Sequence, residues 1–200
     1  MGEVLTDLGS ALLPLSTPPT GAGWNHSDMV QLLGDKPRRP AAVLVGLREG
    51  VQPRLVLTVR TDHLQDHAGQ VAFPGGRTDP GDADAIATAL RESEEEIGLA
   101  RKLVTPMGFL DRFETISGYC ITPVVARIDP EARLYPAPDE VAEVFEVPLS
   151  FFLEPANLRR YTMEFRGHRR DMVEFVHGGH RIWGATAAMV FNLLQRMGRA

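Results

Sequence analysis

The feature that most constrains the fold of this chain is an amphipathic segment over residues 83–97. The Asp-rich stretch GDAD begins it, and Gly98 follows its last residue, as expected for the two ends of a helix. Its core-facing positions recur at helical spacing and are Ile86, Ala89, Leu90, Ser93 and Ile97. Strand-like runs lie both before and after this segment without regular alternation, so the sequence predicts a mixed α/β (α+β) class rather than a doubly wound parallel sheet.

The strand-like runs predict most of the remaining elements. AAVLVGL and RLVLTVR, which flank REGVQP, predict a hairpin or neighbouring strands. Five further strand candidates are VTPMGFLDRF, GYCITPVVARI, VAEVFEVPL, YTMEFRG and DMVEFVHG. HGGH, at 177–180, predicts a hairpin turn, and WGATAAMVFNLLQRM predicts a closing amphipathic helix. We expect Trp183 and the apolar stripe of this helix to lie in the core.

Length and local composition predict one main domain. The chain has 200 residues, 44% of them hydrophobic, which is enough for one sizeable core. Residues 1–36 are rich in Pro, Gly, Ser and Thr and are expected to form a partly flexible N-terminal extension, with residues 37–200 as the catalytic domain. Within the extension, Ser27 is expected to cap a short helix that Gly34 ends.

Charge and cysteine content restrict the partners and the compartment. The net charge of -5 provides no basic field for nucleic acid or anionic lipid, so we expect neither as a partner. The acidic N-terminus and Pro14 argue against a signal peptide, and no run of 18 apolar residues predicts a membrane span. The single cysteine, Cys120, is expected to be a small buried hydrophobe. These features favour the cytoplasm.

Three carboxylates share the polar face of the predicted helix. At about 100° per residue, Glu92 and Glu96 lie about 40° apart and Glu95 lies about 60° from Glu92. Hard divalent cations take oxygen ligands, commonly one or two carboxylates together with substrate phosphates. A solvated acidic face is the alternative, but FPGG and TDPGD lie just upstream, and Arg91 directly before the cluster is placed to orient one carboxylate.

The segment GGRTDPGDADAIATALRESEEEIGL resembles the signature of the Nudix hydrolases. Its second half is in register at Arg91, Glu92, Glu95, Glu96, Gly98 and Leu99, with Ser93 at an apolar position. The first half carries one extra residue, and Asp82 stands where the family usually has glutamate, so Asp82 and Asp79 are both candidates for the salt bridge to the helix. The resemblance implies the Nudix fold, a mixed curved β-sheet sandwiched between α-helices.

An upstream segment resembles the second signature of the coenzyme A pyrophosphatase branch. The matching residues are Leu57, Thr58, Arg60, Gly69, Phe73, Pro74, Gly75 and Gly76, whereas Gln65 stands where an arginine is usual. The resemblance implies metal-dependent hydrolysis of coenzyme A or a derivative to 4'-phosphopantetheine and 3',5'-ADP. Because of Gln65, another nucleoside diphosphate derivative such as ADP-ribose or a dinucleotide stays open as the substrate, and so does a catalytically silent nucleotide sensor.

The resemblance also implies a role for each site residue. Glu92 and Glu96 would ligate Mg²⁺ or Mn²⁺, with Glu95 as a third ligand or as the carboxylate acting on water. Arg91 would orient these carboxylates. Glu140, in a loop before a strand, is a candidate catalytic base or metal ligand, or simply a surface carboxylate.

The substrate contacts are expected from four residues of the upstream signature. Arg60 would contact a phosphate or pair with an aspartate such as Asp62, Gly75 and Gly76 would offer backbone N–H groups, and Phe73 would line the site.

Other motifs carry weaker functional interpretations. His63 and His67 have the spacing of a zinc site, but Leu64 stands where that motif requires glutamate. RGHRRD is a short basic turn that could touch a 3'-phosphate or simply be solvated. The oligomeric state stays open, a homodimer included.

Overall fold

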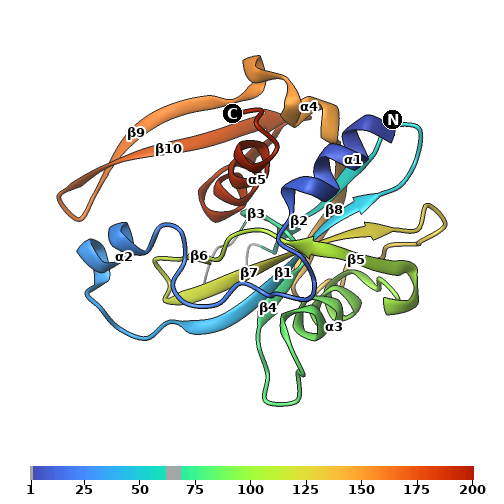
Figure 1. The fold of residues 1–200 in the computed structure, drawn as a ribbon, viewed down its shortest axis with the longest axis horizontal. Helices are drawn as coiled ribbons and strands as arrows, with labels where there is room; N and C mark the ends of the chain where they lie inside the picture. Colours follow the sequence, from blue (N-terminus) through green and yellow to red (C-terminus); the bar gives the residue numbers. More distant parts are fainter. Residues whose placement is uncertain (1, 62–68) are drawn as a thin grey trace.

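A computed structural model of the chain describes residues 2–61 and 69–200, with side chains from Asp7 onward. Its described part contains a mixed eight-stranded sheet, a three-stranded sheet and five α-helices (Figure 1). The strands of the large sheet are β1 (Arg39–Arg48), β2 (Arg54–Arg60), β3 (Val71–Ala72), β4 (Gly75–Arg77), β5 (Val104–Phe109), β6 (Phe113–Glu114), β7 (Tyr119–Ile128) and β8 (Val141–Pro148). The small sheet contains β9 (Arg159–Phe165), β10 (His168–His177) and β11 (His180–Ile182). The helices are α1 (Gly2–Ala11), α2 (His26–Leu33), α3 (Ala85–Ile97), α4 (Leu149–Leu153) and α5 (Gly184–Arg196), with short 3-10 turns at Arg101–Leu103 and Pro155–Asn157.

A parallel pair of strands forms the centre of the large sheet. β1 and β7 run parallel in register from Arg39 opposite Tyr119 to Arg48 opposite Ile128. The sheet order is β3-β2-β1-β7-β5, with β4 pairing with β1, β6 with β7 and β8 with β2. The predicted β1–β2 hairpin is antiparallel, and the predicted HGGH turn joins β10 to β11, so both predictions are confirmed.

Both faces of this sheet are buried. Along β1, Val43, Val45 and Leu47 belong to one apolar cluster, whereas Ala42 and Leu44 belong to another, as the alternation of side chains along a strand requires. The first cluster includes side chains of α1 and α5, and the second includes side chains of α3. Helices therefore cover the sheet on both sides, with α3 below it and α1 and α5 above it in Figure 1, as predicted.

Helix α3 ends where its sequence predicts and begins two residues later than predicted. Asp84 is the N-cap and accepts a 2.8 Å hydrogen bond from the Ala87 N–H. Gly98 ends the helix in the left-handed conformation, at a φ of 65°, which glycine adopts without steric penalty. These two caps set the ends of α3, which packs against β1 and β4 of the large sheet.

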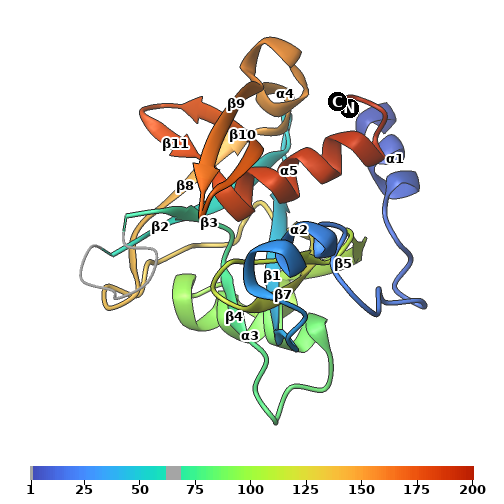
Figure 2. The ribbon, with the colours of Figure 1, turned by 90° about the vertical axis from the view of Figure 1, so that its left-hand side faces the viewer.

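The first 36 residues are more ordered than their composition predicts. The sequence did not predict α1, yet Leu8 and Leu12 of this segment are buried in the cluster beneath α5. The start of α2 was also predicted wrongly, because Asn25 and not Ser27 holds the N-cap position. Asp7 of α1 forms an ion pair of 3.4 Å with Arg199 near the C-terminus, and α1 lies next to the end of α5 on the same side of the large sheet (Figure 1 and Figure 2). The division of the chain at residue 36 stays a prediction.

Two further expectations concern burial. Cys120 is 4% exposed, which confirms it as a buried residue, and burial raises the pKa of its thiol. Trp183 is only half-buried, with the Arg181 guanidinium 5.2 Å from its ring centroid, so its expected place in the core is wrong. Among the helices that the structure describes, we find none with the length and apolarity needed to cross a membrane.

Candidate active site

The polar face of α3 lies against the glycines of β4. The Gly75 N–H donates a 3.0 Å hydrogen bond to Glu96 Oε2. At Gly76, a Cβ atom would lie 2.6 Å from the Glu92 carboxyl carbon. Gly75 itself has a φ of 151°, and a Cβ there would lie 2.4 Å from the Ala42 carbonyl oxygen. Glycine is therefore required at both positions, because a side chain would displace the strand or the carboxylate.

Arg91 joins the loop before α3 to the carboxylates on the helix. Its Nε and Nη2 donate to the two carboxyl oxygens of Asp82 at 3.0 and 2.9 Å, a bidentate arrangement. Its Nη1 donates to Glu92 at 2.9 Å and to Glu95 at 3.0 Å. These bonds hold the Arg91 side chain across the face of α3, with Glu92 and Glu95 on one side and Asp82 on the other.

Asp82 takes the place of the usual glutamate of the signature. Its carboxylate also accepts hydrogen bonds from the Asp79 N–H at 2.9 Å and from the Thr88 hydroxyl at 3.0 Å. The hydrogen bonds from Arg91 hold the pKa of Asp82 well below its usual range, against burial, which raises it. The carboxylate of Asp79 approaches Arg91 only to 3.9 Å. The choice that the sequence left open is thus decided for Asp82. Thr88, which the sequence analysis did not single out, completes its support.

Glu96 is the most buried carboxylate of the cluster, at 4% exposure. Burial is the main cause that raises the pKa of Glu96 to about 7, and the charges of Glu92 and Glu140 raise it further, whereas Gly75 and Arg60 lower it. The pKa of Glu92 is also raised, again mainly by burial. Both carboxylates are therefore destabilised in their charged form and would gain from a bound cation.

Arg60 reaches the same carboxylate from β2. Its Nη1 lies 3.6 Å from Glu96 Oε1. Its Nε atom is buried and has no hydrogen-bond partner among residues 2–61 and 69–200. The Arg60 guanidinium therefore contacts Glu96, and its Nε–H group has no acceptor among the described residues.

Family comparison agrees with this geometry. The family model described as the NUDIX domain matches residues 37–165. The chain belongs to the Nudix family. A Photorhabdus laumondii protein named "Uncharacterized Nudix hydrolase NudL" is 41% identical over 159 residues, which cover 80% of this chain and 85% of that protein. The Escherichia coli K12 protein of the same name is 40% identical over 160 residues, covering 80% and 83%.

A solved structure supports the Nudix fold. The crystal structure of a MutT/nudix family protein from Enterococcus faecalis aligns with a TM-score of 0.51 at 17% identity, over 82% of this chain and 63% of that one. This is a likeness of fold alone. Family membership supports a general Nudix pyrophosphohydrolase activity on a small nucleotide substrate, and Nudix hydrolases generally use divalent metal ions.

The structure gives the surroundings of three residues predicted from the Nudix signatures. The Glu95 carboxylate is 59% exposed and bonded to Arg91, so the structure does not bring it to Glu96. Phe73 is 2% exposed and belongs to the same apolar cluster as Val43 and Val45; its contact with the substrate stays a prediction. The Gly75 N–H, expected to meet a phosphate, is bonded to Glu96.

Glu140 lies in the exposed turn before β8 and is close enough to raise the pKa values of both Glu92 and Glu96. Its backbone is tied to the site, because the Thr61 N–H donates to the Glu140 carbonyl at 3.1 Å and the Ala137 N–H donates to the Glu96 carbonyl at 2.8 Å. The turn is thus anchored beside the carboxylates, while the Glu140 residue is exposed.

The donor set fits a hard divalent cation held by two carboxylates. In the described part of the chain, no three His, Cys, Asp or Glu side chains are grouped to hold a metal. Mg²⁺ usually keeps several waters and binds through one or two carboxylates plus substrate phosphates, so Glu92 and Glu96 suffice on the protein side. Their oxygen donors and raised pKa values agree with this chemistry.

The histidine and basic motifs lie away from these carboxylates or outside the described residues. His63, His67 and Gln65 fall outside the part of the chain that the structure describes. His180 stacks on Phe145, at 4.0 Å between ring centroids, and approaches Glu143 to 3.4 Å. RGHRRD forms the turn between β9 and β10, where Arg170 pairs with Asp28 of α2 at 3.2 Å.

Proposed function

We propose that this Nudix protein hydrolyses the pyrophosphate linkage of coenzyme A or one of its derivatives, releasing 4'-phosphopantetheine and 3',5'-ADP with Mg²⁺ or Mn²⁺ as cofactor. The observation that carries the proposal is the meeting of two sequence signatures at Glu96. This carboxylate belongs to the Nudix helix, and it contacts Gly75 and Arg60 of the upstream signature at 3.0 and 3.6 Å. The compartment that we expect for this reaction is the cytoplasm.

The charge of the site explains why a divalent cation would be needed. Its carboxylates are those of Asp82, Glu92, Glu95, Glu96 and Glu140. Arg60 and Arg91 are the guanidinium groups that contact them. These carboxylates outnumber the guanidinium groups, and the excess of negative charge would repel an anionic pyrophosphate. A divalent cation held by Glu92 and Glu96 would offset this repulsion.

The protein groups would divide the chemistry among them. Glu92 and Glu96 would hold the cation, which when bound neutralises the pyrophosphate and lowers the pKa of a water. Arg60 would donate to a phosphate oxygen through its Nε, which has no hydrogen-bond partner among residues 2–61 and 69–200. One of the two exposed carboxylates, that of Glu140 or Glu95, would take the proton from the attacking water. The attack forms one P–O bond and breaks the bridging P–O bond, so each product leaves as a phosphate monoester.

The test is product analysis with three substrates. We would incubate the protein with coenzyme A, ADP-ribose and diadenosine polyphosphate in Mg²⁺ or Mn²⁺, with an EDTA control, and identify the products by mass. Metal-dependent release of 4'-phosphopantetheine and 3',5'-ADP is the expected result. Cleavage of ADP-ribose alone would refute the substrate and keep the chemistry. Turnover of none of the three would refute the proposal.

Matched variants separate an enzyme from a silent sensor. Glu96→Gln removes a proposed metal ligand, whereas Glu94→Gln, on the same helix, removes only an exposed ion pair with Arg101. We expect the first to lower kcat by at least a hundredfold and the second to leave it within twofold, with both proteins folded. Equal activity of the two variants would remove Glu96 from the mechanism.

A further inference from the structure

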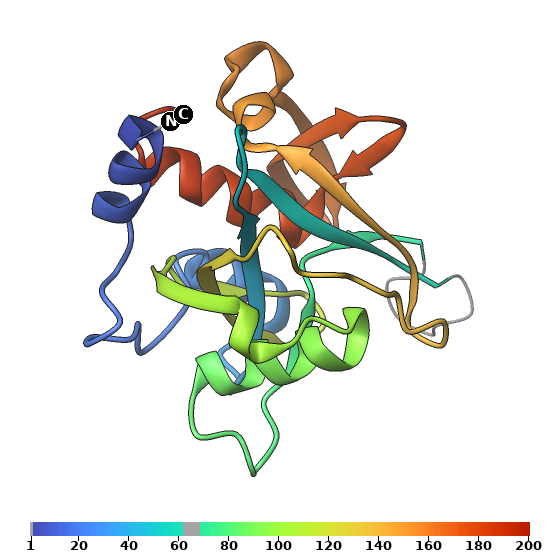
Figure 3. The same ribbon diagram turned by 90° about the vertical axis from the view of Figure 1, so that its right-hand side faces the viewer.

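Strand β8 forms an edge of the large sheet. It pairs with β2 from Arg54 opposite Pro148 to Arg60 opposite Val141, with a register shift that leaves Ala142 without a partner residue. Within residues 2–61 and 69–200, no second strand pairs with it (Figure 3). In an antiparallel strand, every second residue directs its N–H and C=O away from the partner strand. The outer edge of β8 therefore presents backbone groups to which a further strand can bond.

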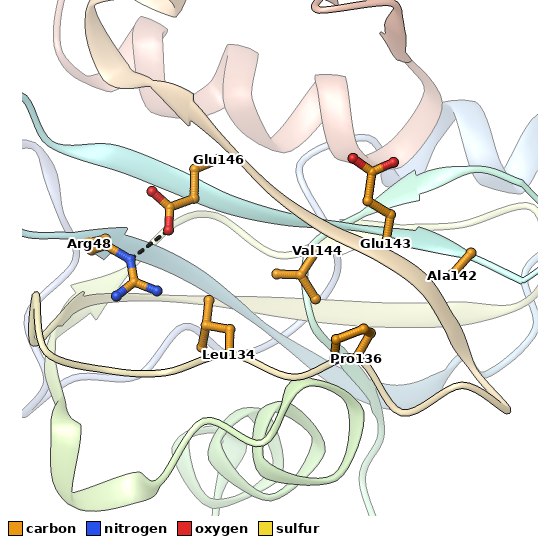
Figure 4. A pocket seen from close by; sticks show the side chains of 7 residues that line it. All are labelled: Arg48, Leu134, Pro136, Ala142, Glu143, Val144 and Glu146. Atoms are coloured by element: carbon orange, nitrogen blue, oxygen red, sulfur yellow. Dashed lines mark hydrogen bonds and ion pairs between the residues drawn. The ribbon is translucent and has the colours of Figure 1, made fainter.

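A groove of about 460 Å³ runs along this edge (Figure 4). Its lining residues are Arg48, Leu134, Pro136, Ala142, Glu143, Val144 and Glu146. The groove touches Ala142, which a register shift leaves unpaired in a β-bulge, and then Glu143 and Val144, so it follows β8 from the bulge into the regularly paired part of the strand. The groove is separate from the candidate active site, because neither Glu92 nor Glu96 lines it.

The far wall of the groove is a short apolar loop. In Figure 4, Leu134 and Pro136 lie on this loop, opposite Val144 of β8. Arg48 holds the loop beside the strand, because its Nη1 donates to the Ala132 carbonyl while its Nε bonds Glu146 at 2.6 Å. Tyr135 lies between the two apolar loop residues and is 62% exposed, which is a large exposed fraction for an aromatic residue. The groove thus combines a free strand edge with an apolar wall, which is what an extended peptide requires.

The acidic charge of the chain is concentrated in the segment that contains the loop and β8, and two carboxylates of this segment, Glu143 and Glu146, line the groove. Residues 129–148 contain six carboxylates and one arginine, a net charge of -5 that equals the net charge of the whole chain. The remaining 180 residues therefore have a net charge of zero. Glu146 is already paired with Arg48 and Arg54, at 2.6 and 3.3 Å. The Glu143 side chain is 50% exposed and lies 3.4 Å from His180, and Figure 4 shows its carboxylate on the side of β8 away from Leu134 and Pro136, so the charge it offers favours a basic side chain on that side of the strand.

We propose that the free edge of β8 binds an extended, basic peptide segment of a partner protein, which adds to the sheet as a further strand. Backbone hydrogen bonds would supply affinity, the apolar wall would take small apolar side chains, and the carboxylates would select lysine or arginine. A second copy of this chain is a poor occupant, because pairing two β8 edges would bring together two copies of the same acidic strand, each with Glu143 and Glu146.

The probe is a blocked hexapeptide of alternating lysine and valine, compared with a matched glutamate–valine peptide. Binding would be measured by fluorescence anisotropy and mapped by backbone amide NMR of the full chain. We expect the lysine peptide to bind at least tenfold more tightly than the glutamate peptide in 50 mM salt, with a smaller ratio in 500 mM salt. The amides of residues 142–146 should shift. A lysine peptide with alternate N-methylated amides should bind at least tenfold more weakly.

Glu143→Lys tests the electrostatic part, with Glu164→Lys as a control of equal charge change on exposed β9. The first should weaken the lysine peptide at least tenfold, and the second less than twofold. The proposal is overturned if both variants behave alike, if the shifts fall outside β8 and its loop, or if neither peptide binds. Concentration-dependent dimerisation through β8 would also overturn it in favour of a second copy.

Discussion

Removing the Asp82 charge should destabilise the protein through Arg91. Asp82→Asn keeps the shape of the side chain but replaces a carboxylate that accepts two hydrogen bonds from Arg91, at 2.9 and 3.0 Å. The pair is well shielded from solvent, because the two side chains are 7% and 18% exposed. Its charge therefore matters more than that of a surface ion pair.

The expected loss is about 3 kcal/mol in the free energy of unfolding at pH 7. Removing one partner of a buried ion pair typically costs about 3 to 5 kcal/mol. The lower end applies here because Arg91 keeps its bonds to Glu92, Glu95 and the Arg77 carbonyl. The matched control is Asp79→Asn, whose carboxylate is 45% exposed and 3.9 Å from Arg91, and we expect it to cost less than about 0.5 kcal/mol.

Urea unfolding followed by tryptophan fluorescence, in EDTA, measures both changes. Because the pKa of Asp82 is lowered in the folded protein, its stabilisation is present above its unfolded pKa of about 4 and is lost as the pH falls. The difference between the wild type and Asp82→Asn should therefore shrink below that pH. Equal costs for the two variants at pH 7 would refute the assignment of Asp82 as the main partner of Arg91.

Three further predictions concern other parts of the structure. Because the pKa of Glu96 rises to about 7 on folding, the metal-free protein should lose about 3 kcal/mol of stability between pH 4.5 and 8, and Glu96→Gln should flatten that slope in urea titrations. Gly76→Ala should cost little stability but weaken Mn²⁺ binding at least tenfold in calorimetry, since its Cβ would displace the Glu92 carboxylate; unchanged affinity would exclude Glu92 as a ligand. Glu114→Gln should weaken the 2.8 Å contact between His26 and the buried Glu114 carboxylate and lower the free energy of unfolding by about 2 kcal/mol. We expect faster proteolysis between residues 12 and 38, with kcat unchanged.

Local patterns predicted the elements whose signals are contained within a few residues. The periodicity and the two caps of α3 are local, and they predicted its bounds to within two residues. The turn chemistry of HGGH and the apolar stripe of α5 were equally local. Strand β4 was missed because its sequence, Gly-Gly-Arg, has little strand propensity and is held as a strand by pairing with β1.

Long-range pairing is what the sequence could not predict. Nothing in the runs 41–47 and 119–128 indicates that they pair parallel, because a buried strand has the same continuous apolar pattern in a parallel and in an antiparallel pair. The partner of Arg91 was also undecidable, since one extra residue in the loop moves Asp82 out of the usual spacing. The loop absorbs this residue through the Asp79–Asp82 turn, where the Asp82 N–H donates to the Asp79 carbonyl at 3.0 Å, so the carboxylate still reaches the helix.

The arrangement of charges explains how four glutamates coexist in one helix. Like charges at neighbouring helical positions each cost a few tenths of a kcal/mol, and here the fold supplies arginines for them. Glu94 pairs with Arg101 at 2.9 Å, Glu92 and Glu95 share Arg91, and Glu96 lies 3.6 Å from Arg60. These contacts are unequal, because only Glu96 is both deeply buried and without a short ion pair. A cation that binds at the site would therefore stabilise the charged form of Glu96 more than that of the other glutamates. For this reason, substitution of Glu96 distinguishes the proposed function from a purely structural role of α3.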